Sequence, residues 1–142
     1  MNDIADLTTG CRGDVIYVVD KSGTIGDDNL ELMKSFLSDL VGKMDIDSGN
    51  TRVGLVPFST NVDTGQSFNL NEHSTVVGVQ SDISSVTWGG WLSFTFTNRA
   101  LEHVRTTMLT SAAGDRSDVH NVVIVLTDGR STYPAGTEVC TV

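Results

Sequence analysis

The segment Val15–Thr24, with the sequence VIYVVDKSGT, joins an apolar run to a carboxylate and two hydroxyls. A near-continuous run of β-branched and aromatic residues is typical of a strand that is buried on both faces of a sheet. Here the run ends at Asp20, and Ser22 and Thr24 follow it. The segment therefore predicts a central strand of an open α/β sheet, with polar groups at the end where such sheets bind ligands.

Strand and helix patterns alternate along the rest of the chain. This alternation predicts a Rossmann-like, doubly wound α/β fold, with a mostly parallel sheet and helices on both faces. One short strand should return antiparallel at the edge of the sheet, because only a tight turn separates it from its neighbour. The expected strands are 14–19, 51–59, 67–70 and 122–126, and the expected helices are 30–44, a short one within 72–86, and 100–110.

Further polar residues follow two later segments. Thr95 and Thr97 end a loop rich in glycine and aromatic residues, and Asp128 follows the buried-looking strand 122–126. We expect these residues to meet Asp20 at one edge of the sheet. Two carboxylates and several hydroxyls are hard oxygen ligands, which suit Mg²⁺ better than zinc. The sequence does not choose between Thr95 and Thr97.

This pattern resembles the metal-ion-dependent adhesion site of the von Willebrand factor type A domain, known in integrins as the inserted domain. Asp20, Ser22 and Thr24 match its Asp-x-Ser-x-Ser motif, with threonine where the third position is usually serine. Thr95 matches the distant threonine, and Asp128 matches the final aspartate. The resemblance implies that these five residues hold Mg²⁺, or Mn²⁺ or Ca²⁺, without catalysis.

The resemblance also implies a protein partner and a location. The metal ion would accept a carboxylate from a protein ligand, such as collagen or another matrix protein. The domain would then be extracellular, secreted as part of a longer chain. Extracellular domains of this type often carry a terminal cysteine pair, and Cys11 fits that habit. Whether Cys11 pairs with Cys140 stays open, because two cysteines are weak evidence of a disulfide.

We expect the 142 residues to form one partial domain with its core at 14–131. The family continues past the strand equivalent to 122–126 with further helices and two more strands, whereas few residues follow Asp128 here. The last strands of the family fold should therefore be absent. The outer edge of the strand 122–126 would then be exposed, which favours aggregation.

Composition and charge exclude some functions. The chain has 18 acidic and 9 basic residues and a net charge of -9, which argues against nucleic-acid binding. No segment approaches the roughly 20 apolar residues that cross a membrane, and the first ten residues lack the pattern of a secretory signal. The histidines are scattered, outside any catalytic or zinc-binding spacing.

Two other functions remain as alternatives. The chain could be an intracellular scaffold, or a structural matrix fragment with no working metal site. More remotely, the sequence DKSGT at 20–24 resembles the phosphorylation loop of P-type ion pumps, which would make Asp20 a nucleophile. That chemistry also needs a second acidic cluster, a nucleotide domain and membrane helices, which the sequence does not supply.

Two further motifs allow a simple structural interpretation. The tripeptide Arg12-Gly13-Asp14 is one that integrins bind on exposed loops, but we expect Asp14 merely to open the first strand. The aromatic residues of the loop before Thr95 could either form an exposed rim beside the metal or pack the loop against the sheet. These are Trp88, Trp91, Phe94 and Phe96.

Overall fold

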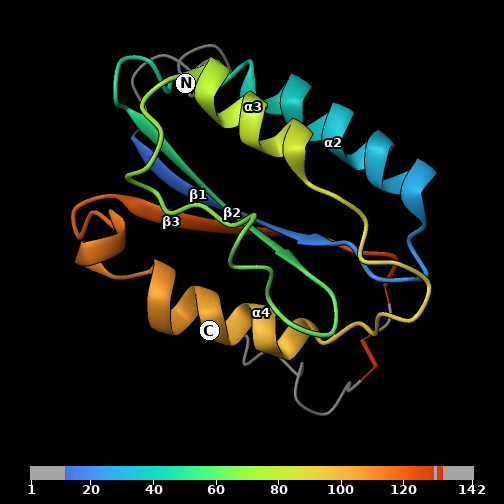
Figure 1. Cartoon of the computed structure of the whole chain (residues 1–142). Helices are drawn as coiled ribbons and strands as arrows, with labels where there is room; N and C mark the ends of the chain where they lie inside the picture. Colours follow the sequence, from blue (N-terminus) through green and yellow to red (C-terminus); the bar gives the residue numbers. More distant parts are fainter. Residues whose placement is uncertain (1–11, 130, 133–142) are drawn as a thin grey trace, which may run out of the picture.

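Three parallel strands form the centre of the structure, a computed structural model that describes residues 12–129 and 131–132. β1 (Gly13–Asp20) lies between β2 (Thr51–Phe58) and β3 (His120–Leu126) (Figure 1). Both neighbours run parallel to β1 in continuous register. The carboxyl ends of all three strands therefore lie at one edge of the sheet, as the sequence predicts.

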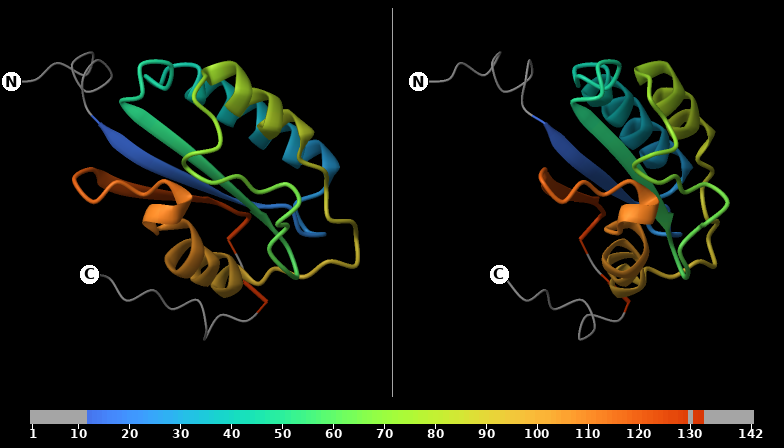
Figure 2. Two further views of the ribbon diagram at one scale, coloured as in Figure 1. Left: turned by 60° about the vertical axis from the view of Figure 1, so that its left-hand side comes forward. Right: turned by 90° about the vertical axis from the view of Figure 1, so that its left-hand side faces the viewer.

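Helices cover both faces of this sheet (Figures 1 and 2). α2 (Asp27–Val41) and α3 (Val76–Ser85) lie on one face. α4 (Thr97–His103), which continues into a π-helical turn (Val104–Met108), lies on the other. The predicted α/β architecture is confirmed, including the short helix expected within 72–86. A 3₁₀ turn (Ser111–Ala113) precedes β3.

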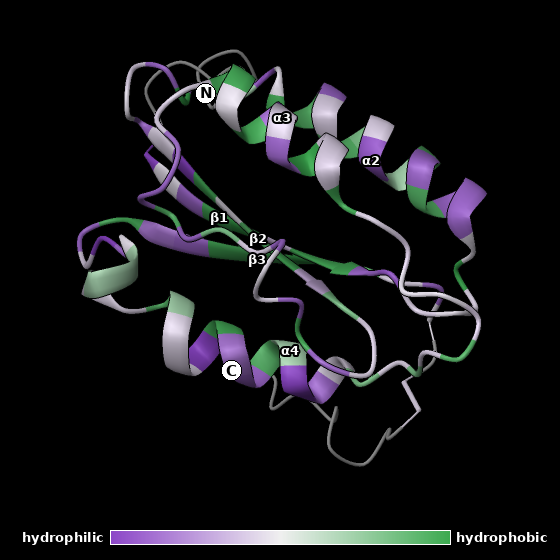
Figure 3. Ribbon diagram, in the orientation of Figure 1, coloured by the Kyte–Doolittle hydropathy of each residue, from purple (hydrophilic) through white to green (hydrophobic). Residues whose placement is uncertain are grey.

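β1 is buried on both faces because its alternating side chains enter two separate hydrophobic clusters. Val15, Tyr17 and Val19 pack with residues of α2 and α3, whereas Ile16 and Val18 pack with residues of α4 and its π-helical turn. Hydrophobic and hydrophilic residues alternate along α2 in Figure 3, as expected of a helix with one buried face. Burying each large apolar side chain contributes about 1.5–3 kcal/mol, so β1 stabilises the packing on both faces of the sheet.

The helix predicted at 100–110 begins earlier than its apolar pattern suggests. α4 starts at Thr97. Its first turn consists of the polar residues Thr97, Asn98 and Arg99, so the apolar spacing did not reveal it. After His103 the backbone widens into π-helical geometry, and the N–H of Leu109 bonds the carbonyl of Val104 at 2.9 Å.

The antiparallel edge strand predicted at 67–70 is reduced to a single bridge. Phe68 exchanges two backbone hydrogen bonds with Leu55 of β2, at 3.0 and 3.1 Å. The ladder stops there because the chain turns immediately afterwards, where the N–H of Glu72 bonds the carbonyl of Asn69. The direction of the pairing was predicted correctly, but its length was not.

β3 lies where the sequence predicts it but is not buried. Val122, Val123 and Val125 are exposed, and β1 is its only neighbouring strand in the part of the chain that the structure describes. Its burial was inferred from apolar composition alone, which does not reveal how many neighbours a strand has. The exposed edge expected along 122–126 is present within these described residues.

The amino end of the sheet is closed by a buried ion pair. Asp14 is fully buried and accepts hydrogen bonds from the Arg116 side chain, from Nη2 at 2.6 Å and from Nε at 2.9 Å. The backbone N–H of Arg116 bonds the other carboxylate oxygen at 2.9 Å. Asp14 thus opens the strand, as expected, and its carboxylate is not presented on a loop.

Within residues 12–129 and 131–132, none of the helices is both long enough and apolar enough to span a membrane. Cys11 and Cys140, whose pairing the sequence leaves open, lie outside the described residues.

Candidate metal centre

The carboxylate of Asp20, at the carboxyl end of β1, is fully buried. One oxygen accepts a hydrogen bond from the backbone N–H of Ser22 at 2.9 Å, and the other accepts one from the Thr127 hydroxyl at 2.7 Å. Both donors are neutral, and no basic side chain in the described part of the chain forms an ion pair with Asp20. Such a carboxylate is costly unless a cation supplies the missing charge.

Three hydroxyl groups beyond Asp20 form a connected set. The hydroxyl of Thr95 donates to Ser22 Oγ at 2.8 Å, and Ser22 Oγ lies 3.4 Å from Thr24 Oγ1. Ser22 and Thr95 are buried, whereas Thr24 is exposed. The structure therefore joins the motif after β1 to a threonine far along the chain.

Asp128 reaches the same place from the loop after β3. It is exposed, and with Thr24 and Thr95 it lines an open pocket of about 390 Å³, whose lining Ser131 and Thr132 complete. The five residues expected from the sequence are thus brought together, through direct contacts or through this shared pocket. Their side chains present the hard oxygen atoms that Mg²⁺ prefers.

The structure distinguishes the two candidate threonines. Both are buried, but Thr95 lines the pocket and bonds Ser22, whereas Thr97 begins α4 and is not among the residues that line the pocket. Thr95 is therefore the threonine in position to reach a metal ion.

Three hydroxyl residues that the sequence analysis missed support the site. Thr127 bonds Asp20, while Thr132 holds both backbone groups of Thr95: its hydroxyl accepts from the Thr95 N–H at 3.0 Å, and its own N–H donates to the Thr95 carbonyl at 2.7 Å. The Ser131 hydroxyl bonds that carbonyl at 3.1 Å. All three flank Asp128 in the sequence, which is the one signal that could have revealed them.

The loop after α3 braces the backbone of the Asp20 motif. The N–H of Gly89 bonds the carbonyl of Lys21 at 2.8 Å, and the indole N–H of Trp88 bonds the carbonyl of Ser22 at 2.9 Å. The approach is so close that a Cβ on Gly23 would lie 2.6 Å from the carbonyl oxygen of Trp91, and a Cβ on Gly89 would lie 2.6 Å from that of Lys21. Glycine is needed at both positions.

Lys21 sits inside the motif but is bonded elsewhere. Its buried ammonium pairs with Asp63 at 2.5 Å and bonds Gln66 Oε1 at 3.0 Å. This lysine therefore ties the motif to the turn after β2, and its charge is already balanced by Asp63.

The described residues offer no other arrangement of metal-binding side chains. No group of three or more histidine, cysteine, aspartate or glutamate side chains there could hold a metal ion. His73 instead pairs with Asp82 at 2.7 Å and packs edge-on against Phe68. The hydroxyl-rich site at Asp20 is thus the candidate metal centre.

The chain is similar to several known proteins. A family model described as the von Willebrand factor type A domain matches residues 14–141. The collagen alpha-5(VI) chain of Mus musculus is 35% identical over 136 residues, which cover 89% of this chain and 5% of that protein. Vitrin of Mus musculus is 33% identical over 122 residues, covering 86% and 18% respectively. The chain spans less than a fifth of the length of these relatives.

Solved structures give the same match. Proximal thread matrix protein 1 from the mussel byssus superposes with a TM-score of 0.76 and 29% identity, over 87% of this chain and 32% of the mussel chain. Another structure of that mussel protein, 27% identical to this chain, has a zinc-occupied metal-ion-dependent adhesion site. The fold class predicted from the sequence is confirmed by these matches.

Proposed function

The chain belongs to the von Willebrand factor type A family, and we propose that it is a divalent-metal-dependent adhesion module that binds an acidic side chain of a protein ligand. Asp20, Ser22, Thr24, Thr95 and Asp128 hold the ion in this proposal. When bound, the ion supplies a positive charge and a coordination position that a carboxylate can fill. The chain's own residues hold and orient it, and catalysis is not part of the proposal.

The observation that carries the proposal is the state of the Asp20 carboxylate. It is fully buried, its two hydrogen-bond donors are neutral, and the nearby Lys21 ammonium is engaged by Asp63. A divalent ion at the adjoining pocket compensates this buried charge. Asp128, which is exposed and lines the pocket, adds a second carboxylate.

We infer the preferred ion from the types of ligand. Carboxylate and hydroxyl oxygens favour Mg²⁺, with Mn²⁺ and Ca²⁺ as alternatives. The zinc in the mussel matrix protein makes Zn²⁺ a necessary comparison in any titration.

The kind of partner is inferred from the relatives. Several of them are collagen chains, and a structural relative is a thread matrix protein. We therefore place the domain outside the cell, bound to a collagen or another matrix protein. An intracellular scaffold, or a matrix fragment without a working metal site, predicts no metal-dependent binding.

Two measurements test the proposal. Calorimetric titration with Mg²⁺ should show one site, which Asp20→Asn abolishes and Asp28→Asn, which removes an exposed carboxylate on α2, leaves intact. Binding to immobilised fibrillar collagen should occur in Mg²⁺ and be lost in EDTA. Undiminished collagen binding in EDTA, or equal Mg²⁺ binding by Asp20→Asn, contradicts the metal bridge.

A further inference from the structure

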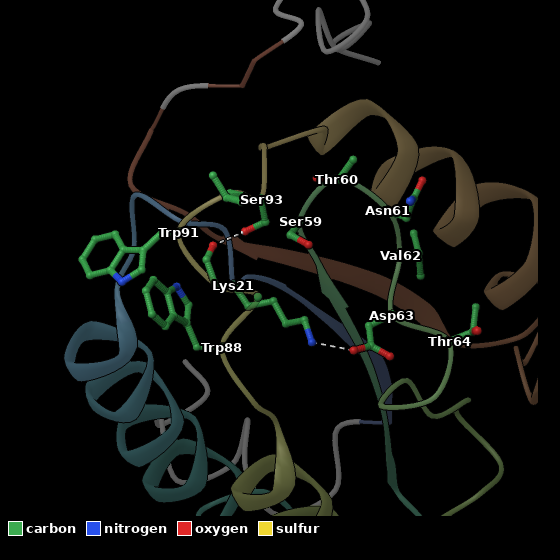
Figure 4. Close-up of a pocket in the computed structure, with 13 residues that line it drawn as sticks. Lys21, Ser59, Thr60, Asn61, Val62, Asp63, Thr64, Trp88, Trp91 and Ser93 are labelled. Carbon is green, nitrogen blue, oxygen red and sulfur yellow. Dashed lines mark hydrogen bonds and ion pairs between the residues drawn. The ribbon is translucent and has the colours of Figure 1, made fainter.

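A groove lies beside the candidate metal centre, between the loop 88–93 and the turn 59–64 (Figure 4). Its volume is about 930 Å³, more than twice that of the metal-site pocket, and falls in the range of sites that hold sizeable ligands. Lys21 extends between the two loops toward Asp63 (Figure 4). The groove and the metal site share the loop that braces the Asp20 motif.

The wall formed by the turn 59–64 is fixed by hydrogen bonds. The N–H of Phe94 bonds Thr60 Oγ1 at 2.9 Å, and the N–H of Phe96 bonds the carbonyl of Ser59 at 3.0 Å. Arg99 of α4 bonds the Thr60 carbonyl at 2.8 Å and Asn61 Oδ1 at 2.7 Å. A ligand would therefore meet a preformed surface, with little ordering cost in the protein.

The opposite wall is apolar and exposed. Trp91 is 80% exposed although its ring meets that of Trp88 edge-on at 4.7 Å, and Leu92 is 94% exposed. We call Trp91 and Leu92 the apolar rim. The alternative that the aromatic loop packs against the sheet holds for Trp88, which joins the core cluster, but not for the rim. Exposed large apolar residues beside a groove are typical of binding surfaces.

The charge in the groove favours an uncharged occupant. Lys21 and Asp63 are the charged side chains that line it, and they neutralise each other. The remaining polar lining consists of hydroxyls and the Asn61 amide. An apolar ligand side chain can therefore be buried there without leaving a ligand charge unpaired.

The rim lies close to the metal site along the chain. The Trp91 carbonyl packs against Gly23 of the Asp20 motif, and Thr95, which lines the metal-site pocket, follows only four residues later. Four residues span at most about 14 Å. A ligand in extended conformation can therefore occupy both sites with side chains about four positions apart or fewer.

We propose that the groove and its apolar rim bind a large apolar side chain that lies within about four residues of the ligand's acidic residue, in an extended segment of the partner. This inference rests on the proposed function, because the acidic residue is taken to bind the metal ion. The rim then selects among acidic segments those that carry a leucine-like or aromatic neighbour. The metal supplies attraction for any carboxylate, and the groove supplies the preference.

Two peptides with blocked ends test the preference, Gly-Leu-Gly-Glu-Gly-Leu-Gly and the same sequence with serine in place of leucine. Both are titrated into the full chain in Mg²⁺, and binding is followed by NMR of the tryptophan indole signals. We expect the leucine peptide to bind roughly fivefold more tightly, since a partly buried leucine gives a modest gain. A third peptide, the leucine peptide with glutamine in place of glutamate, should not bind, because it lacks the carboxylate.

Substitutions locate the preference on the rim. Leu92→Ser, and the double variant that also carries Trp91→Ser, should bring the affinities for the leucine and serine peptides to within about twofold of each other. The affinity for the serine peptide should stay unchanged. Leu32→Ser on α2, which alters an equally apolar residue that is 69% exposed, should keep the full preference. If the double variant folds poorly, Leu92→Ser still tests the inference, because the Leu92 side chain is almost wholly in solvent and its replacement should not disturb folding.

The outcomes separate this inference from the proposed function. Magnesium-dependent binding of both peptides with equal affinity overturns the groove preference alone. Binding of neither peptide, or binding that persists in EDTA, overturns both proposals. A concentration-dependent dimer that Trp91→Ser abolishes would show that a second copy of the chain covers the rim, and would also overturn the inference.

Discussion

Two carboxylates lie at opposite ends of β1, both fully buried, but their partners differ. At the amino end, Asp14 is bonded by the guanidinium and backbone of Arg116, with contacts of 2.6 to 2.9 Å. At the carboxyl end, Asp20 receives one backbone N–H and one hydroxyl, from Ser22 and Thr127. The same residue type, on the same strand and at the same depth, is thus neutralised at one end and not at the other.

The difference separates an element of stability from an element of binding. Removing one member of a buried ion pair leaves the other charge uncompensated, which costs several kcal/mol. A buried carboxylate with only neutral donors carries that cost already, and binding a cation relieves it. The amino end of β1 is therefore completed by the fold itself, whereas we infer that the carboxyl end is completed by an ion from solution.

The largest expected effect is at the amino end. Asp14→Asn should lower the free energy of unfolding by about 3–5 kcal/mol, because the Arg116 guanidinium loses its buried counter-charge. Urea unfolding followed by tryptophan fluorescence measures this change. Asp118→Asn, which breaks the exposed pair with Arg12, should change stability much less, because solvent screens that pair. Similar losses of stability in the two variants would show that the buried Asp14 pair matters no more to stability than the exposed pair.

The carboxyl end should respond to metal instead. Mg²⁺ at one hundred times its dissociation constant should stabilise the wild type by about 2.7 kcal/mol, seen as a rise in the unfolding midpoint. Asp20→Asn should abolish that rise while unfolding no more easily than the wild type in EDTA, because it removes an uncompensated buried charge and keeps the shape. If Asp20→Asn is destabilised in EDTA as much as Asp14→Asn, the contrast between the two ends is wrong.

The middle of β1 provides a reference free of carboxylates. Burial raises the pKa of Tyr17 to about 12. Between pH 10 and 12 the unfolded chain loses this phenolic proton while the folded chain keeps it, so stability present below pH 10 falls as the pH rises. We expect a loss of about 2 kcal/mol by pH 12, measured by urea unfolding at a series of pH values. Tyr17→Phe should flatten this part of the profile, and an unchanged profile contradicts the assignment to Tyr17.

The smallest effect concerns the threonines beside Asp20. Thr95→Val should weaken Mg²⁺ binding by about tenfold, because it removes the hydroxyl that bonds Ser22 from a residue that lines the pocket. Thr97→Val alters a buried threonine at the start of α4 and should change the affinity by less than about twofold. Calorimetric titration of both variants makes the comparison. If Thr97→Val weakens Mg²⁺ binding more than Thr95→Val does, then Thr97 belongs to the metal site in place of Thr95.

Much of the fold follows from local patterns in the sequence. β1 and β2 are recognisable as nearly continuous runs of β-branched and apolar residues, and α2 is recognisable because its apolar residues recur with the period of a helix. The extent of the pairing between Phe68 and Leu55, and the exposure of β3, were not recognisable, since both depend on which segments lie alongside. Composition shows that a residue is apolar but not whether anything covers it.

The candidate site was partly predictable for a similar reason. Asp20, Ser22 and Thr24 are neighbours in sequence, and Asp128 ends a strand, so parallel topology suffices to bring them to one edge. The choice of Thr95 over Thr97 depends on a contact with Ser22 across 73 positions. The roles of Thr127, Ser131 and Thr132 likewise depend on contacts between distant loops.

The sequence by itself therefore determined the α/β architecture, the edge at which polar groups collect and the types of atom available there. Only the tertiary structure decided which buried carboxylate has a cation, because Arg116 reaches Asp14 across 102 positions while no basic side chain among the described residues pairs with Asp20. The tertiary structure also decided that Trp88 packs while Trp91 faces solvent. Charge compensation and exposure arise from distant segments in contact, and local sequence patterns do not record them.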